Sequence, residues 1–182
     1  MKKIIKRKFQ VGVIGSAGTE EYPRGGGASV KTMALAREIG SLLAKRDAIV
    51  VTGGKSGIME AAARGAKEFG GTTVGIVSGS KRFTANDFTD IEVPTGMSAV
   101  GYDELLLVLM CDALIVLGGG VGTLEEIAIA YRNRKPVVVL DSVEGWGKEL
   151  LSKKYLDSRQ TVKIQMAETP KEAVDMAISS IK

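Results

Sequence analysis

The chain has 182 residues, which is enough for one domain with a sizeable buried core. It contains no histidine and one cysteine, Cys111, so the composition excludes Ser–His triads, imidazole metal ligands and a disulfide framework, and we predict no metal site. The formal net charge is +4, and residues 1–8 alone carry five positive side chains, so the remainder is close to neutral.

This charge distribution predicts a basic N-terminal arm over residues 1–8 and one domain over residues 9–182. A basic arm is usually a solvated tail, so we expect no nucleic-acid partner. No run approaches the ~20 apolar residues of a membrane-spanning helix, and no signal-peptide pattern precedes the first predicted strand. We therefore expect no membrane association and a cytoplasmic location.

Short apolar runs alternate with segments of helical periodicity along the chain. The runs are mostly β-branched or leucine-rich and do not alternate with polar residues, which is typical of parallel strands covered on both faces. The predicted strands are 9–14, 48–52, 72–77, 113–117 and 136–140, with weaker candidates at 91–93 and 162–164. The predicted helices are 29–43, 56–69, 102–110, 123–133, 147–155 and 170–181, and 80–90 is the most loop-like interior stretch.

This order predicts the α/β fold class: a single doubly wound, mainly parallel, Rossmann-like sheet with helices on both faces. In such sheets ligands bind at the carboxyl ends of the strands, where the strand order reverses. Two helix starts have a capping-box pattern, Thr123 with Glu126 and Thr169 with Glu172, and Ser56 is placed to cap the helix that follows it.

Glycine-rich loops follow three of the predicted strands, so we expect them to face one crevice. Free N–H groups of such loops and the positive end of a helix dipole bind phosphate. We predict phosphate or ligand binding by these loops, with Met97 as a further pocket residue. The residues are Gly15, Ser16 and Ala17 in the first loop, Thr52, Gly53, Gly54, Lys55, Ser56 and Gly57 in the second, and Gly118, Gly119, Gly120, Val121, Gly122 and Thr123 in the third.

Two adjacent carboxylates, Glu125 and Glu126, follow the third loop. They are candidates for catalysis, because a carboxylate can stabilise an oxocarbenium-like centre or assist a water molecule. A structural role is the alternative, since Glu126 can complete the capping box and Glu125 can complement the helix dipole.

The loops match neither of two common nucleotide-binding patterns. The second loop contains Gly-Lys-Ser, but the P-loop spacing requires glycine at position 49, which is Ile49. The first loop has Ala17 and Glu20 where the dinucleotide pattern requires glycines. An ATPase and a standard dinucleotide dehydrogenase are therefore disfavoured.

The loop set resembles that of the LOG-like superfamily, a Rossmann-like group once labelled as lysine decarboxylases. The Gly-Gly-x-x-Gly-Leu-Met-type motif corresponds to 53–59, and the Pro-Gly-Gly-x-Gly-Thr-x-x-Glu motif corresponds to 118–126 with Gly118 in place of proline. The resemblance implies a homodimer that binds a phosphorylated small molecule. Some members cleave nucleoside 5′-monophosphates to a free base and ribose 5-phosphate, and a shorter branch includes molybdenum-cofactor carrier proteins.

One departure separates this chain from the phosphoribohydrolase branch. That branch has a Met-His-x-Arg-Lys segment before the third loop, whereas residues 95–104 contain no His, Arg or Lys, and Asp103 stands near the arginine's place. We therefore predict a carrier-like binding protein for a nucleotide-like or pterin ligand, with molybdenum cofactor or a nucleoside monophosphate as the bound molecule and no required cofactor. The alternative is a phosphoribohydrolase in which Arg24 or Arg82 replaces the missing arginine. Nothing in the sequence supports a pyridoxal-phosphate decarboxylase.

Overall fold

The computed structural model describes residues 7–18, 23–24, 27–97 and 101–181, and in them it contains a seven-stranded sheet with the strand order β6-β5-β4-β1-β7-β8-β9. All neighbouring strands of this sheet pair in parallel. The predicted fold class is therefore confirmed. The strands are β1 (Gln10–Gly15), β4 (Ile49–Thr52), β5 (Thr73–Val77), β6 (Ile91–Pro94), β7 (Ala113–Leu117), β8 (Val137–Leu140) and β9 (Ile164–Ala167).

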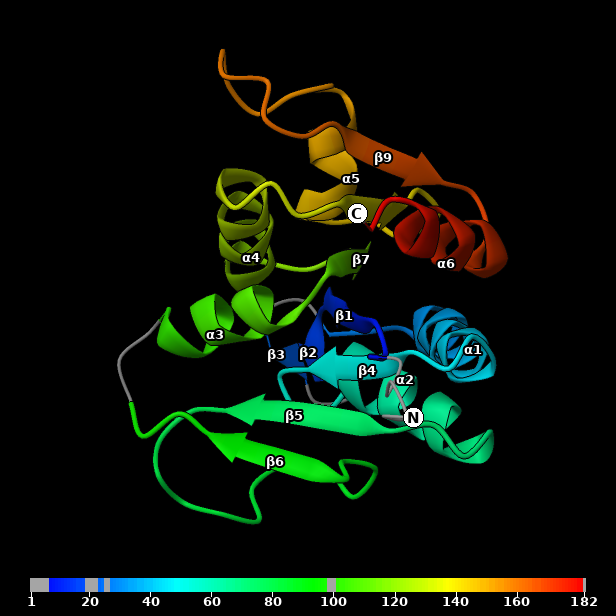
Figure 1. Ribbon diagram of the computed structural model, residues 1–182, viewed down its shortest axis with the longest axis vertical. Coiled ribbons are helices and arrows are strands. Elements are labelled where there is room, and N and C mark those ends of the chain that lie inside the picture. Colours follow the sequence, from blue (N-terminus) through cyan, green and yellow to red (C-terminus); the bar gives the residue numbers. More distant parts are fainter. Residues whose placement is uncertain (1–6, 19–22, 25–26, 98–100, 182) are drawn as a thin grey trace, which may run out of the picture.

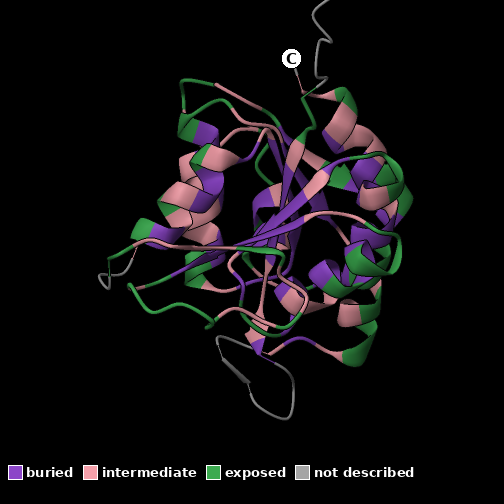
Figure 2. Ribbon diagram, turned by 60° about the horizontal axis from the view of Figure 1, so that its bottom comes forward, coloured by how far each residue is buried: buried purple, intermediate pink, exposed green. Residues whose placement is uncertain are grey.

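Helices cover both faces of the sheet (Figure 1). One face packs against α1 (Val30–Lys45), α2 (Ile58–Glu68) and α6 (Pro170–Ser179), and the other against α3 (Tyr102–Met110), α4 (Val121–Arg132) and α5 (Trp146–Leu151). The inner strands are almost entirely buried between these layers, whereas the edge strands β6 and β9 are partly exposed, and the helices turn their buried residues toward the sheet (Figure 2). This double burial explains why the strand sequences are apolar at successive positions.

The strand order reverses beside β1. The chain runs from β1 outward through β4, β5 and β6, and then returns to β7 on the other side of β1. Because α1 and α4 follow β1 and β7 on opposite faces, the loops after these two strands diverge and leave a crevice between them. The first and third glycine-rich loops flank this crevice, and the second loop follows β4 next to it.

Two of the three helix-cap predictions were wrong. Helix α2 begins after Gly57 and α4 after Gly120, and in neither does a side chain cap the first turn, so Ser56 and Thr123 are not N-caps. Thr123 lies inside the first turn of α4 and is buried, because the helix begins two residues earlier than predicted. Thr169 does cap α6, where its hydroxyl accepts from the N–H of Glu172.

Other differences from the predicted elements are local. Helix α5 ends at Leu151 instead of residue 155, and β9 lies two residues later than its candidate strand. A two-stranded antiparallel ribbon, β2 (Ala17–Gly18) with β3 (Pro23–Arg24), was not predicted. In the described part of the chain, no helix has the length and apolar character needed to span a membrane.

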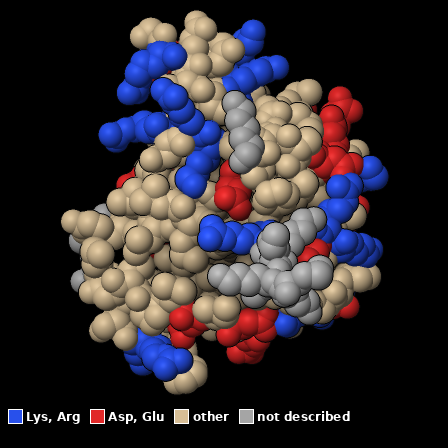
Figure 3. Space-filling view, viewed as in Figure 1, with Lys and Arg blue, Asp and Glu red and all other residues tan. Residues whose placement is uncertain are grey.

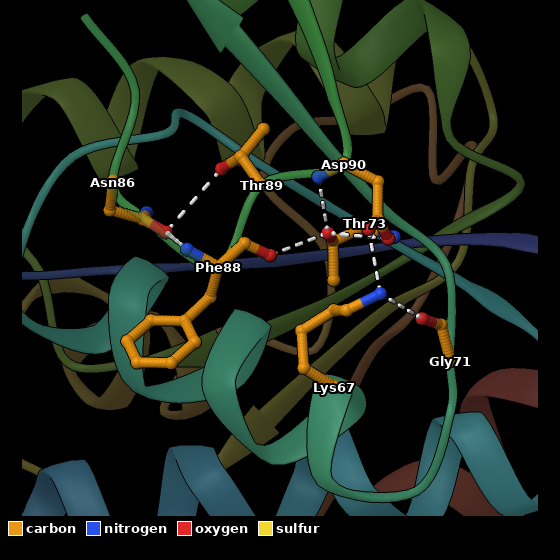
Figure 4. Close-up of polar contacts among 7 residues, drawn as sticks. All are labelled: Lys67, Gly71, Thr73, Asn86, Phe88, Thr89 and Asp90. Atoms are coloured by element: carbon orange, nitrogen blue, oxygen red, sulfur yellow. Dashed lines mark hydrogen bonds and ion pairs between the residues drawn. The ribbon is translucent and has the colours of Figure 1, made fainter.

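The connection from β5 to β6 contains no helix, as predicted for residues 80–90. Its last residues are fastened to the start of β5, where Asp90 accepts from the N–H of Thr73 at 2.9 Å and from Lys67 of α2 at 2.6 Å. The Thr73 hydroxyl donates to the Phe88 carbonyl at 2.6 Å (Figure 4). These bonds give an irregular segment a fixed path across the end of α2.

Candidate functional site

A cavity of about 270 Å³ lies at the carboxyl ends of the central strands. Its walls come from all three glycine-rich loops, from α2 and α3 and from the first turns of α4, which places it at the reversal of the strand order. The lining residues are Gly15, Ser16, Ala17, Gly53, Lys55, Met59, Ile76, Asp103, Glu104, Leu107, Gly120, Val121, Gly122, Thr123 and Glu126.

The first and second glycine-rich loops are in direct contact with each other. The Ile58 N–H donates to the carbonyl of Ser16 at 3.2 Å, which joins the start of α2 to the first loop. Gly57 has a φ of 78°, and a Cβ atom there would lie 2.4 Å from the Gly18 carbonyl oxygen. The two loops can approach this closely only because Gly57 has no side chain.

The cavity brings together many, but not all, of the predicted ligand-binding residues. Thr52, Gly54, Ser56, Gly57, Gly118 and Gly119 belong to the loops but do not line it. Thr52 is buried and its hydroxyl accepts from the Gly54 N–H at 3.1 Å, so it shapes the second loop. Met97 is 41% exposed and also lies outside the lining.

The two adjacent glutamates point to different places. Glu126 lines the cavity. The Oε1 atom of Glu125 instead lies 2.7 Å from the position that a Cβ on Gly101 would occupy, at the start of α3. A carboxylate there complements the dipole of α3, which is a structural role. Of the two candidates, only Glu126 is placed to contact a ligand in this cavity.

Helix α3 contributes two adjacent carboxyl groups, those of Asp103 and Glu104, to the cavity near Lys55. Asp103 is buried and accepts a hydrogen bond from the Ser78 hydroxyl at 2.6 Å, and its Oδ2 lies 3.6 Å from Lys55 Nζ. Glu104 is next to it in the lining, and its buried Oε2 has no hydrogen-bond partner among the described residues. Within the described part of the chain, Lys55 is the single cation that lines the cavity.

The pKa values of these acids are shifted in opposite directions. Burial raises the pKa of Glu126 to about 8, with a further contribution from the Glu104 carboxyl. Burial, followed by the Asp103 carboxyl, also raises the pKa of Glu104. Burial acts on Asp103 as well, but hydrogen bonds from Glu104 and Ser78 and the charge of Lys55 outweigh it and lower its pKa. At neutral pH, Asp103 is therefore ionised opposite Lys55, while Glu126 is mostly neutral.

We predict that replacing Glu126 with glutamine stabilises the protein more at pH 9 than at pH 5. The unfolded side chain loses its proton near its usual pKa of 4.5, whereas the folded one keeps it up to about 8, so stability falls as the pH rises through this window. Since each pKa unit corresponds to about 1.4 kcal/mol, the difference between 4.5 and about 8 corresponds to roughly 5 kcal/mol, and the variant should gain about this much at pH 9, above both pKa values. Urea unfolding at both pH values measures this gain.

The matched control is the Glu125→Gln variant, which removes a neighbouring carboxylate that does not line the cavity. Its effect on the free energy of unfolding should be nearly the same at pH 5 and pH 9. An equal effect of Glu126→Gln at the two pH values would contradict the raised pKa.

One of the two proposed substitutes for the family arginine, Arg82, lies outside the cavity. The Arg82 guanidinium lies over the ring of Phe83, 5.1 Å from its centroid, and does not line the cavity. The side chain of Arg24 and residues 98–100 of the divergent segment lie outside the described residues. Exposed basic side chains gather instead over the segment between α5 and β9 (Figure 3), which includes Lys153, Lys154 and Lys163.

Sequence reasoning missed the apolar part of the lining. Ile76 and Leu107 look like ordinary core residues, and the arrangement of β5 and α3 that exposes them to the cavity depends on long-range packing. Asp103 and Glu104 were noted only as departures from a family pattern. The only indication in the sequence was a pair of acidic residues at the start of an apolar helix. Acidic residues are expected there in any case, because they complement the helix dipole.

Comparisons with known proteins found similar sequences and similar folds. The model of the SLOG cluster4 family matches residues 8–174. An uncharacterized protein of Archaeoglobus fulgidus is 36% identical over 175 residues, which cover 94% of this chain and 96% of that protein. A cytokinin riboside 5′-monophosphate phosphoribohydrolase of Mycobacterium tuberculosis is 28% identical over 153 residues, or 77% of this chain and 82% of that protein. The molybdenum cofactor binding protein of Rippkaea orientalis superimposes with a TM-score of 0.79 at 29% identity, covering 97% and 99% of the two chains.

Proposed function

The chain belongs to the SLOG cluster4 family, and from this premise we propose that it binds a phosphorylated nucleotide-like or pterin ligand in the cavity between its glycine-rich loops, as a carrier-like protein. The phosphate lies against the first turn of α4 and beside Lys55. The rest of the ligand extends toward Asp103, Glu104 and Glu126.

The observation that carries this proposal is the uncapped start of α4 at the cavity wall. Val121, Gly122 and Thr123 form the first turn and line the cavity, and the N-cap residue, Gly120, has no side chain that could cap that turn. The first N–H groups of a helix need acceptors from outside the helix, and the dipole favours an anion there. A phosphate oxygen satisfies both requirements.

The charge of the cavity is compatible with this ligand. Three carboxyl groups beside a phosphate would repel it if all were ionised. The raised pKa of Glu126 removes one negative charge at neutral pH, and Lys55 balances Asp103. The similarity to the molybdenum cofactor binding protein of Rippkaea orientalis supports a phosphorylated pterin as one ligand class.

A phosphoribohydrolase is the second candidate, and the state of Glu126 favours it. A neutral glutamic acid in a partly buried cavity is suited to be a general acid that protonates a departing base, while an ionised carboxylate such as Asp103 stabilises an oxocarbenium-like ribosyl centre. Water would then add to the anomeric carbon and give a proton to the Glu126 carboxylate, which yields ribose 5-phosphate and restores the acid. The similarity to the Mycobacterium tuberculosis phosphoribohydrolase supports this candidate, whereas the missing arginine argues against it.

The requirement for phosphate tests the binding proposal. We expect isothermal titration calorimetry at pH 7 to give a Kd for AMP at least ~10-fold lower than that for adenosine, because a charge-assisted contact contributes about 1.5–3 kcal/mol. Equal affinities, or no binding of AMP, phosphorylated pterin or other nucleoside 5′-monophosphates, would contradict it. We also expect a cytoplasmic homodimer, and light scattering measures the oligomeric state.

A further inference from the structure

The irregular segment between β5 and β6 contacts the backbone of Lys55, which lines the cavity. Asn86 lies in the middle of this segment. Its backbone N–H donates to the Gly54 carbonyl at 2.8 Å, and its Nδ2 donates to the Lys55 carbonyl at 3.0 Å. One residue, 31 positions away in the sequence, thus binds two successive carbonyl groups of the second glycine-rich loop.

Asn86 is itself held from its C-terminal side. Its Oδ1 accepts from the Phe88 N–H at 3.2 Å, and Phe88 is connected to Thr73 and Asp90 through the hydrogen bonds that join this segment to β5 (Figure 4). The Phe88 ring lies 5.6 Å from the guanidinium of Arg64 in α2. These contacts fix the direction from which the Asn86 amide reaches Lys55.

A carboxylate holds the segment from the other side. Glu92 of β6 accepts from the backbone N–H groups of Phe83, Thr84 and Ala85, at distances of 2.5, 2.7 and 2.9 Å. These hydrogen bonds lower the pKa of Glu92 to about 2, so the carboxylate stays ionised at neutral pH. Phe83 adopts a left-handed φ of 60°, an unfavourable conformation that the surrounding contacts impose.

The Lys55 side chain needs such support. Its side chain is 52% exposed, and the Oδ2 atom of its partner in the cavity, Asp103, is 3.6 Å from Nζ. A long lysine side chain on a glycine-rich loop has many accessible conformations, and fixing the backbone reduces the entropy lost when a ligand orders it. The glycines of the same loop, Gly53, Gly54 and Gly57, have no side chain that could restrain Lys55.

We propose that Asn86 is a positioning residue that holds Lys55 in the orientation in which its ammonium group faces the cavity and meets the ligand's phosphate. This inference deepens the proposed function and rests on it for the identity of the ligand. The part that concerns Lys55 itself is independent of the ligand, because the contacts occur in the protein alone.

The first test measures Lys55 without a ligand. Mild acetylation with acetic anhydride followed by mass spectrometry gives the labelling rate of Lys55, with Lys31 on α1 as the internal reference. In Asn86→Ala and Asn86→Ser we expect Lys55 to react about threefold or more faster relative to Lys31, because loss of the hydrogen bond to the Lys55 carbonyl loosens its loop and its ion pair with Asp103. The exposed Asp87→Ala in the same segment is the matched control and should leave the ratio unchanged. An unchanged Lys55 ratio in both Asn86 variants would overturn the proposal.

The second test asks whether Asn86 acts through Lys55. We expect Asn86→Ala to weaken AMP binding about three- to tenfold, and to have no further effect in a Lys55→Ala background. The same weakening in both backgrounds would overturn the proposal, because Asn86 would then act by another route. If the wild-type protein binds no phosphorylated ligand, the proposed function fails, while the acetylation ratio still decides whether Asn86 positions Lys55.

Discussion

Replacing Gly57 with alanine is expected to destabilise the protein by about 3 kcal/mol and to abolish ligand binding in the variant that remains folded. The residue has a left-handed φ of 78°, which costs alanine about 1 kcal/mol. The added Cβ would also lie 2.4 Å and 2.7 Å from the carbonyl oxygens of Gly18 and Ser16, so the first and second loops would have to separate. Urea unfolding measures the first effect and calorimetry with AMP the second.

Gly70 provides the matched control for this prediction. It has a similar left-handed φ of 67°, but a Cβ atom there would have no neighbour within 4 Å. Gly70→Ala should therefore cost only the conformational penalty, about 1 kcal/mol, and should leave AMP binding unchanged. Equal free energies of unfolding for the two variants would contradict a contribution of the contact between the loops to stability.

Replacing Lys55 with alanine is expected to weaken AMP binding by about 10- to 100-fold with little change in the free energy of unfolding. Lys55 supplies the positive charge of the cavity lining, and without it the ionised Asp103 would repel the phosphate. The side chain is 52% exposed, and an ion pair at such a site contributes about 0–1 kcal/mol to stability. Calorimetry gives the Kd values, and urea unfolding gives the stability.

Lys81→Ala is the control for the loss of a positive charge. Lys81 is exposed in the neighbouring segment between β5 and β6 and does not line the cavity. Its replacement should change the Kd for AMP by less than about twofold, since exposed charges are screened by salt. A similar loss of affinity in both variants would mean that general electrostatic attraction, and not a contact with Lys55, accounts for the binding.

The sheet could be predicted from the sequence because strands that are buried on both faces consist of successive apolar residues. The strands β4, β7 and β8 consist of successive apolar residues, and the segments between them show helical periodicity. The strand β9 was misplaced because its sequence, Ile-Gln-Met-Ala, is only partly buried at the sheet edge and contains few β-branched residues. The glycine-rich loops could be assigned to one edge of the sheet, since the carboxyl ends of parallel strands share that edge.

The interior of the cavity could not be predicted to the same degree. A capping-box pattern at Thr123 indicated a helix start that the loop geometry shifts to Val121, and this shift leaves the N–H groups of the first turn uncapped. The separation of Glu125 from Glu126 depends on where α3 packs against α4, which local sequence does not encode. The contact of Asn86 with Lys55 joins an irregular segment to a distant loop, and no periodic pattern signals it.

The most direct test of the central claim is to incubate the purified protein with nucleoside 5′-monophosphates and to quantify, by chromatography, both the intact nucleotide that the protein retains and the free base that is released. Glu126→Gln and Lys55→Ala are analysed in parallel. A carrier-like protein retains intact nucleotide, releases no base above the level of a protein-free control, and loses retention in Lys55→Ala. Release of free base by the wild-type protein that disappears in Glu126→Gln would contradict the carrier-like function and establish the phosphoribohydrolase.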